Sequence, residues 1–179
     1  MFKTNRCLLR VAVITVTAAV LALAATANAG STQTLSGTFV VHFGRGVGAS
    51  NGSCPVQTFC GTGMLSGFAS GTQLTEFTSF EPIDDTACAD VTITQTITVS
   101  LGTLVLDENG LFCSPGASDG APSSPSDYGH PHTIQLRYEV DGAASTGIFG
   151  GATGSGTESV EIAGDVGKSR LSGTLTLAS

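Results

Sequence analysis

The feature that most constrains this chain is a period-two alternation of apolar and polar residues. Its clearest example is Val91–Leu101, where Thr and Ser alternate with Val91, Ile93, Ile97, Val99 and Leu101. This spacing places the apolar side chains on one face of a β-strand and the hydroxyl side chains on the other. After residue 30, no window of ten or more residues has helical periodicity. The sequence therefore predicts an all-β fold.

Further segments show the same alternation over shorter lengths, and Gly-containing turn signals such as Asn109-Gly110 and Asp141-Gly142 punctuate the chain. About eight to ten short antiparallel strands would leave exposed edges unless the sheet closes or doubles over. We expect a single antiparallel β-barrel of about eight strands, with a β-sandwich as the alternative. The other predicted strands are Thr34–Phe43, Met64–Phe68, Leu74–Phe80, Thr103–Asp107, His132–Val140, Glu158–Ile162 and Leu171–Leu177.

The first 29 residues have the three-part pattern of a secretory signal peptide. A basic region precedes the uncharged run Val11–Ala25, and small residues at Ala27 and Ala29 favour cleavage before Gly30. A transmembrane anchor is the alternative, although the run is short for a helix that needs ~20 apolar residues to cross a bilayer. We expect a secreted or cell-envelope protein, with one domain over 30–179 and no membrane span after cleavage.

The charge balance excludes one class of partner. The chain has 7 Lys and Arg against 14 Asp and Glu, a formal net charge of -7. Because phosphate binding needs a basic surface, we expect no nucleic-acid partner. The segment 114–131 is rich in Pro, Ser and Gly and has no apolar periodicity, so it is predicted to be a long surface loop, either a lid or a solvated excursion.

Four cysteines follow the predicted signal peptide, namely Cys54, Cys60, Cys88 and Cys113. An even number in an oxidising compartment predicts two disulfides, for which three pairings are possible. Cys54 and Cys60 share one polar loop, and Cys88 and Cys113 flank a segment that folds back near Leu101, so we favour 54–60 and 88–113. A zinc site would need closely spaced cysteine pairs, which are absent from the sequence. No metal is expected.

Alternation also identifies candidate ligand-binding residues. Polar side chains on the apolar phase of a strand point into a barrel, where they must find partners or bind a ligand. The alternative is that they satisfy one another or lie near the rims. Tyr138 is the best candidate, because its ring can pack while its hydroxyl orients a ligand. The full set is Gln95, His132, Tyr138 and Glu158.

Other motifs are weaker. His130-Pro131-His132 could chelate a metal with Asp119 or Asp127, but a lone His-x-His in a Pro-rich loop is more often ordinary surface. Asp107–Gly110 lacks the alternating ligands of a calcium loop and is interpreted as a turn. Gly44–Gly48 lacks the full spacing and the following helix of a dinucleotide fingerprint. No cofactor is expected, and no catalytic residue is identified.

The segment Ser145–Gly156, with Phe149 followed by Gly150-Gly151, resembles the Gly-x-Phe-x-Gly-Ala-x-Gly hairpin of the allene oxide cyclase and dirigent-like barrels. As in secreted bacterial members, a strand and a closing Ser-Gly-Thr-Leu segment follow, here Ser172–Leu175. The resemblance implies a calycin-like, eight-stranded antiparallel barrel with an apolar interior. It also implies that Phe149 plugs one barrel end, while the glycines permit a tight, bulged hairpin.

Three function classes follow. The favoured one is a secreted barrel that binds a small apolar ligand in its interior or serves only as a structural module in the envelope or medium. The second is a cyclase, isomerase or dirigent-type enzyme acting on a hydrophobic substrate, and the third is an extracellular surface-interaction module. A cavity lined by the interior candidates would favour the first two, whereas a filled interior with an exposed aromatic patch would favour the third. The sequence leaves open both the oligomeric state and the choice between binder and enzyme.

Overall fold

The structure, a computed structural model, describes residues 30–44, 54–55, 58–113, 132–164 and 166–179. The strands of this part of the chain follow one another in sequence, and a single-turn 3-10 helix, η1 (Gly147–Phe149), precedes the seventh. The strands are β1 (Thr32–Phe43), β2 (Thr58–Leu65), β3 (Ala69–Pro82), β4 (Cys88–Val99), β5 (Gly102–Cys113), β6 (His132–Val140), β7 (Thr153–Ala163) and β8 (Val166–Thr176).

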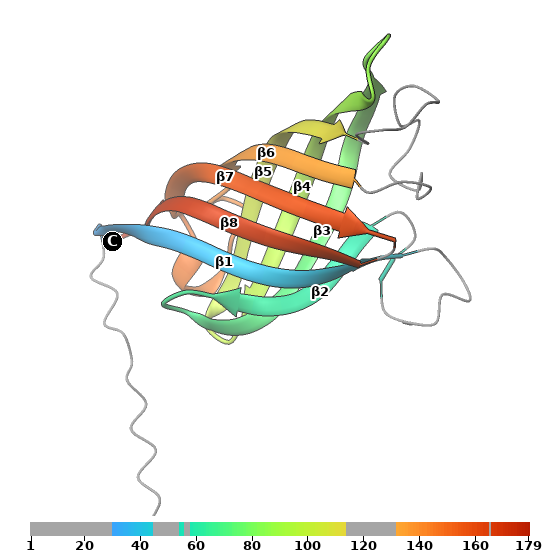
Figure 1. Cartoon of the computed structure of the whole chain (residues 1–179). Helices are drawn as coiled ribbons and strands as arrows, with labels where there is room; N and C mark the ends of the chain where they lie inside the picture. The colour runs from blue at the N-terminus through green and yellow to red at the C-terminus, as the bar shows by residue number, and fades with distance from the viewer. Residues whose placement is uncertain (1–29, 45–53, 56–57, 114–131, 165) are drawn as a thin grey trace, which may run out of the picture.

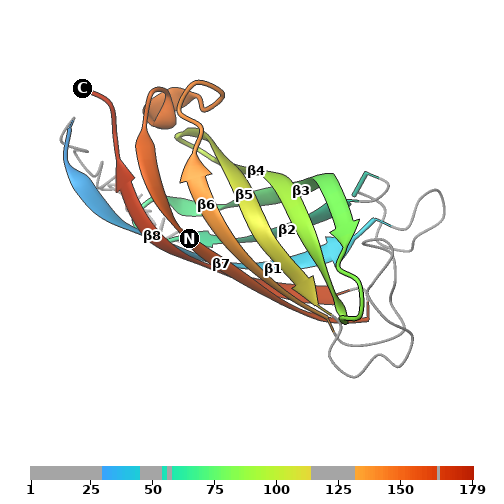
Figure 2. The same ribbon diagram turned by 90° about the horizontal axis from the view of Figure 1, so that it is seen from above.

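Each strand pairs antiparallel with the next, and β8 pairs with β1, so the sheet closes into a barrel (Figures 1 and 2). The β1–β8 ladder joins the two ends of the domain from Thr32 opposite Thr176 to His42 opposite Val166. Closure pairs both edges of the sheet and leaves neither strand open for association. The predicted barrel is confirmed, and the sandwich alternative is wrong.

The apolar side chains of the predicted alternation point into the barrel and form its core. In β4 the apolar residues are all buried, namely Val91, Ile93, Ile97 and Val99. The threonines that alternate with them are exposed or partly exposed on the outer face. The prediction for Leu101 is wrong, because β4 ends at Val99 and Leu101 lies in the following turn with 46% of its surface exposed. The core is therefore a single column of inward side chains from all the strands.

The two ends of the barrel differ. The η1 end carries the β2–β3 and β4–β5 turns, the β6–β7 connection and the C-terminus (Figure 1). There Phe149 is fully buried against Phe68, with ring centroids 5.1 Å apart. Phe149 therefore closes this end, as the resemblance implied. The opposite end, where β1 finishes and β6 begins, is called the mouth below.

A β-bulge in β3 shapes the mouth. The register of the β3–β4 ladder shifts between Phe77 and Ser79, which leaves Thr78 as the extra residue. Phe77 is opposite Ile93 and Phe80 is opposite Val91, two residues on the inner face of β4. Without the bulge, side chains three residues apart would point to opposite faces. The extra residue thus turns both phenylalanine rings inward.

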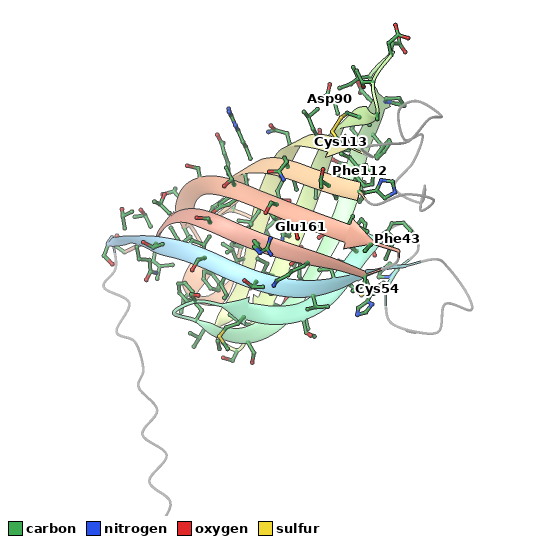
Figure 3. The ribbon with its side chains drawn as sticks, viewed as in Figure 1. Phe43, Cys54, Asp90, Phe112, Cys113 and Glu161 are labelled. Carbon is green, nitrogen blue, oxygen red and sulfur yellow. A yellow bond between two sulfur atoms is a disulfide. The ribbon has the colours of Figure 1, made fainter. Side chains whose placement is uncertain are left out.

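Both predicted disulfides are present at the mouth end. Cys54 and Cys60 are joined, with their Cα atoms 5.4 Å apart, and Cys88 and Cys113 are joined directly across the β4–β5 ladder. Figure 3 labels Cys54 and Cys113 at this end of the barrel. Disulfides persist in oxidising surroundings, so both bridges are compatible with an extracellular location.

In the described ranges, no helix is long and apolar enough to span a membrane. The predicted signal peptide, the Gly44–Gly48 segment after Gly44 and the predicted loop 114–131 lie outside the described residues.

Three further local predictions were wrong. Asp107–Gly110 is not a turn but the middle of β5, because β4 and β6 pair with it from both sides. A side chain at Gly110 would overlap the carbonyl oxygen of Gln135 in β6, which explains a glycine within a strand. The strand predicted at Met64–Phe68 ends at Leu65, and Phe68 belongs to the turn.

The third error concerns Ser145–Gly156. This segment is not one bulged hairpin, because its first half contains η1 and only its end belongs to β7. Gly151 has a φ of 73°, a left-handed conformation that favours glycine, whereas Gly150 has an ordinary φ of -58°. The expectation of a glycine-specific backbone therefore holds for Gly151 alone.

Candidate functional site

A cluster of polar side chains lies inside the barrel, and each strand from β3 to β8 contributes one of them. Each of these side chains is at most 2% exposed. Because buried polar groups need hydrogen-bond partners, such a cluster costs stability unless its members bond to one another or to a ligand. The polar cluster consists of Gln73, Gln95, Glu108, Tyr138, Glu158 and Ser169.

Glu158 of β7 is the hub of the polar cluster. Its Oε1 accepts a hydrogen bond from the hydroxyl of Ser169 and one from Gln73 Nε2 at 3.3 Å. Gln73 Nε2 also lies 3.1 Å from Thr75 Oγ1 and donates to it. These donors hold the Glu158 carboxylate in a fixed position.

Gln95 of β4 bridges the two carboxyl groups. Hydrogen bonding assigns the orientation of its amide, since only one orientation satisfies both ends. In that orientation its nitrogen donates to Glu108 Oε1 at 2.6 Å and to Glu158 Oε2, while its oxygen accepts from Gln73 Nε2 at 2.7 Å. Gln95 thereby links three strands on opposite walls of the barrel.

The carboxyl groups of Glu108 and Glu158 also hydrogen-bond to each other, which requires a proton on one of them. Burial raises the pKa of Glu108 well above its ordinary value, and the negative charge of Glu158 raises it further. Burial also raises the pKa of Glu158, although the hydrogen bonds it accepts oppose that rise. Glu108 is therefore the proton holder and Glu158 the acceptor.

Tyr138 of β6 stands directly opposite Glu108 in the β5–β6 ladder and opposite Gly156 in the β6–β7 ladder. Its hydroxyl oxygen is buried and has no hydrogen-bond partner in the described part of the chain. Burial and the charges of the two glutamates raise its pKa from 10.0 to about 12, so the hydroxyl keeps its proton. Tyr138 thus presents an unused donor and acceptor inside the barrel.

Two glycines make room for this hydroxyl. Gly156 and Gly173 pair with each other across β7 and β8, and a Cβ on either would overlap the Tyr138 hydroxyl. Larger residues at these positions would force the ring out of place. The part of β7 and β8 beside Tyr138 therefore accommodates the hydroxyl because Gly156 and Gly173 have no side chains.

A small cavity adjoins the polar cluster and leaves room for about one water molecule. Its polar lining comes from Glu158, Gln73 and Thr75. Tyr138 does not line it, although its ring belongs to the same interior. The apolar lining consists of Val41, Phe59, Ile93, Ile134, Leu136 and Val160.

A chain of aromatic rings connects this cavity to the mouth. Phe59 packs against Phe43 with ring centroids 4.8 Å apart and against Phe77 at 5.8 Å. Phe80 and Phe112 continue the chain, and both Phe77 and Phe80 are partly exposed. Figure 3 labels Phe43 and Phe112 at this end. The rings form an apolar layer between the mouth and the cavity.

All four side chains predicted to face the interior are buried there. Gln95, Tyr138 and Glu158 meet in the polar cluster, whereas His132 lies at the mouth, where its ring packs 5.0 Å from that of Phe112. His130, Asp119 and Asp127 of the weak metal motif lie outside the described residues. In the described ranges, no group of three or more His, Cys, Asp or Glu side chains is placed to hold a metal.

Sequence reasoning missed Gln73, Glu108 and Ser169. Ser169 continues the inward phase of Leu171 and Leu175, so extending the β8 alternation toward the N-terminus would have found it. Glu108 continues the phase of Leu104 and Leu106, but the adjacent Asn-Gly pair indicated a turn. No protein-family model, curated protein or solved structure matches the chain, so the site is interpreted from its own geometry.

Proposed function

We propose that this protein is a secreted barrel that binds a small, largely apolar molecule in its interior. The observation that carries the proposal is an interior cavity whose lining is apolar except for Glu158, Gln73 and Thr75. The adjoining polar cluster also contains the Tyr138 hydroxyl, which is buried and has no hydrogen-bond partner among the described residues. A few polar groups in an apolar cavity suit a ligand with one polar end.

The aromatic rings at the mouth support the same proposal. A ligand would enter through the mouth, displace the partly exposed rings of Phe77 and Phe80, and place its apolar body among the phenylalanines. Its polar end would then reach the cavity at Glu158. Apolar lining with a few convergent polar groups is typical of small-molecule sites. The resemblance to the allene oxide cyclase and dirigent-like barrels agrees with this use of the interior.

The proton shared by Glu108 and Glu158 favours a second candidate, an isomerase or cyclase. A neutral carboxyl group beside a carboxylate offers both a proton donor and a proton acceptor in one apolar site. The surface-module class has less support, because the exposed large apolar residues of the described chain include no aromatic ring.

Native mass spectrometry of protein purified from its own culture medium tests the proposal. We expect an added mass that is lost on denaturation. A matched variant, Val160→Ile, adds one methylene group to the apolar wall of the cavity and should be secreted and folded by circular dichroism but free of the added mass. Wild-type protein that carries no added mass, and that binds no member of a panel of small apolar compounds, would contradict ligand binding.

The same ligand separates binder from enzyme. If the isolated compound is returned to the purified protein and recovered unchanged, the protein is a binder. If it is converted, Glu108→Gln and Glu158→Gln should slow the conversion, because each removes one partner of the proton transfer. Conversion at the wild-type rate in both variants would exclude the glutamates as the acid and base.

A further inference from the structure

β3 is longer than the strand beside it, so part of its edge is open. β2 begins at Thr58, which lies opposite Glu76, whereas β3 continues to Pro82. Beyond Glu76, β3 pairs with β4 on one side, and none of the described residues pairs with it on the other. The β3–β4 tip projects beyond the neighbouring strands (Figure 1). Closure of the barrel therefore leaves residues 78–82 of β3 with one uncovered edge.

The backbone of this open edge offers hydrogen-bonding groups to a further strand. The N–H of Ile83 donates to the carbonyl oxygen of Cys88, with 3.0 Å between the two atoms. Because alternate residues of an antiparallel strand face the same neighbour, Glu81 also bonds to β4, while Phe80 and Pro82 face away from it. Proline has no N–H, which agrees with its place on the open side. The edge thus presents the N–H of Phe80 and the carbonyl oxygens of Phe80 and Pro82.

The charge around the open edge is entirely acidic. Residues 69–99, which comprise β3, β4 and the turn between them, contain five Asp and Glu residues and no Lys, Arg or His. Glu81 and Asp90 are opposite each other in the ladder, and both are exposed. Because like charges opposite each other are unfavourable, a basic side chain beside Glu81 would relieve the repulsion. A second copy of this chain would instead bring the same acidic strand to the contact.

The inner side of an added strand would meet apolar surface. Phe77 and Phe80 point inward at the mouth and are partly exposed. Side chains of a strand alternate between its two faces, so one set would lie beside these rings and the other beside Glu81. β-Branched side chains pack well against aromatic rings across a ladder. The open edge therefore fits an extended segment in which basic and apolar residues alternate.

We propose that residues 78–82 of β3 form a docking edge for an extended polypeptide segment of alternating basic and apolar residues. The segment adds one strand to the sheet, accepts a hydrogen bond from Phe80, and donates to the carbonyl oxygens of Phe80 and Pro82. Its basic side chains face Glu81 and Asp90, and its apolar side chains face the rings at the mouth. The contact is made at the edge of the sheet and does not depend on the proposed function of the interior.

Fluorescence anisotropy of labelled hexapeptides tests the inference. Lys-Val-Lys-Val-Lys-Val should bind, with an affinity that falls as salt screens the charges. Two control peptides should bind about tenfold more weakly or worse. Glu-Val-Glu-Val-Glu-Val reverses the charge, and the basic peptide methylated on all its backbone nitrogens keeps the charge but has no N–H to donate.

Hydrogen exchange followed by NMR locates the contact. The basic peptide should slow exchange of the Phe80 amide about tenfold or more, because that N–H gains a partner. The Glu81 amide, which bonds to β4 with and without the peptide, should change much less.

Matched variants separate the docking edge from the overall charge of the protein. Glu81→Lys should weaken binding of the basic peptide about tenfold or more, because it replaces an attraction with a repulsion. Glu139→Lys makes the same change of charge at an exposed position of β6. This control should leave the affinity within about twofold, because salt screens a charge on another wall of the barrel.

Several results would overturn the inference. They are equal binding of the acidic and basic peptides, equal losses in the two variants, binding without slower exchange at Phe80, and no binding by any of the peptides. Slow exchange at Phe80 in concentrated protein alone, together with dimers in sedimentation velocity, would assign the edge to a second copy and would also overturn it. None of these results bears on the cavity, so the proposed function is tested separately.

Discussion

Glu108 and Tyr138 are paired directly across the β5–β6 ladder, with both side chains inside the barrel. Two groups that normally seek water thus lie side by side within an apolar core. Glu108 is bonded to Gln95 and Glu158, but the Tyr138 hydroxyl has no bond in the described chain. Removing the Tyr138 hydroxyl therefore breaks no hydrogen bond within the described chain, whereas removing the Glu108 carboxyl group breaks those to Gln95 and Glu158.

Replacing Tyr138 with Phe should leave the ligand-free protein as stable as before or more stable, by ~1 kcal/mol, because the change removes a buried hydroxyl that has no partner. Urea denaturation at neutral pH measures the difference. A loss of more than ~1 kcal/mol would mean that the hydroxyl has a partner after all. If a bound ligand uses the hydroxyl, Tyr138→Phe should instead lower the stability of the ligand-bound protein.

The stability of the protein should fall as the pH rises above about 5. The pKa of Glu108 is raised in the folded state, so with rising pH the unfolded chain ionises first, near the ordinary value of 4.5, and is favoured. Glu158 acts in the same direction, and Tyr138 adds a further loss between pH 10 and about 12. Urea denaturation at a series of pH values checks this order.

Glu108→Gln is the matched test of that pH dependence. Because its amide donates to Glu158 without needing a proton, the variant should lose much less stability between pH 5 and 9 than the wild type. Glu161→Gln, on the outer face, should retain the wild-type slope. Equal slopes in all three proteins would show that the buried pair does not govern the pH response.

The adjacent glycines 150 and 151 should differ sharply in their tolerance of a side chain. Gly151→Val should destabilise by ~1–3 kcal/mol, because its φ is left-handed and its Cβ would lie 3.2 Å from that of Ala178. Gly150→Ala should change stability by less than ~0.5 kcal/mol, since nothing lies within 3.4 Å of its Cβ. Thermal melts of the two variants compare them. Comparable melting temperatures for both would contradict the assigned backbone conformations.

The disulfide between Cys88 and Cys113 should contribute more to stability than the one between Cys54 and Cys60. It closes a separation of 25 residues against 6, which gives ~3 kcal/mol against ~2 kcal/mol when chain entropy is the main effect. Urea denaturation of the two paired Cys→Ala variants measures both losses. A larger loss from the shorter loop would indicate that strain or local packing at the mouth outweighs chain entropy.

The sequence predicted the barrel and much of its interior because alternation depends only on local geometry. His132–Val140 matches β6 in both bounds, and the inward phase of Tyr138 follows from its neighbours Leu136 and Ile134. The disulfide between Cys88 and Cys113 was predicted from the fold-back of the chain near Leu101. The β4–β5 hairpin that forms there places the two cysteines opposite each other.

The rest of the site depends on contacts that no short window contains. Asn109-Gly110 has the chemistry of a hairpin turn, yet pairing with β4 on one side and β6 on the other keeps the chain extended. Gln73 was hidden because the bulge at Thr78 breaks the phase between Gln73 and Phe80. The contact between Glu108 and Glu158 joins β5 to β7 across the interior, past β6, which lies between them in the sheet, and no short window of sequence contains both residues.

The extra residue at Thr78 divides β3 into two parts that can vary separately. Before it, Gln73 and Thr75 are fixed by their bonds to the polar cluster. Phe77, just before it, and Phe80, after it, pack against other rings and against the apolar core near the mouth. A shift or substitution beyond Thr78 can therefore reshape the entrance without moving the amide that supports Glu158. Substitutions at the mouth could therefore change which molecules enter the barrel while the polar cluster around Glu158 stays unchanged.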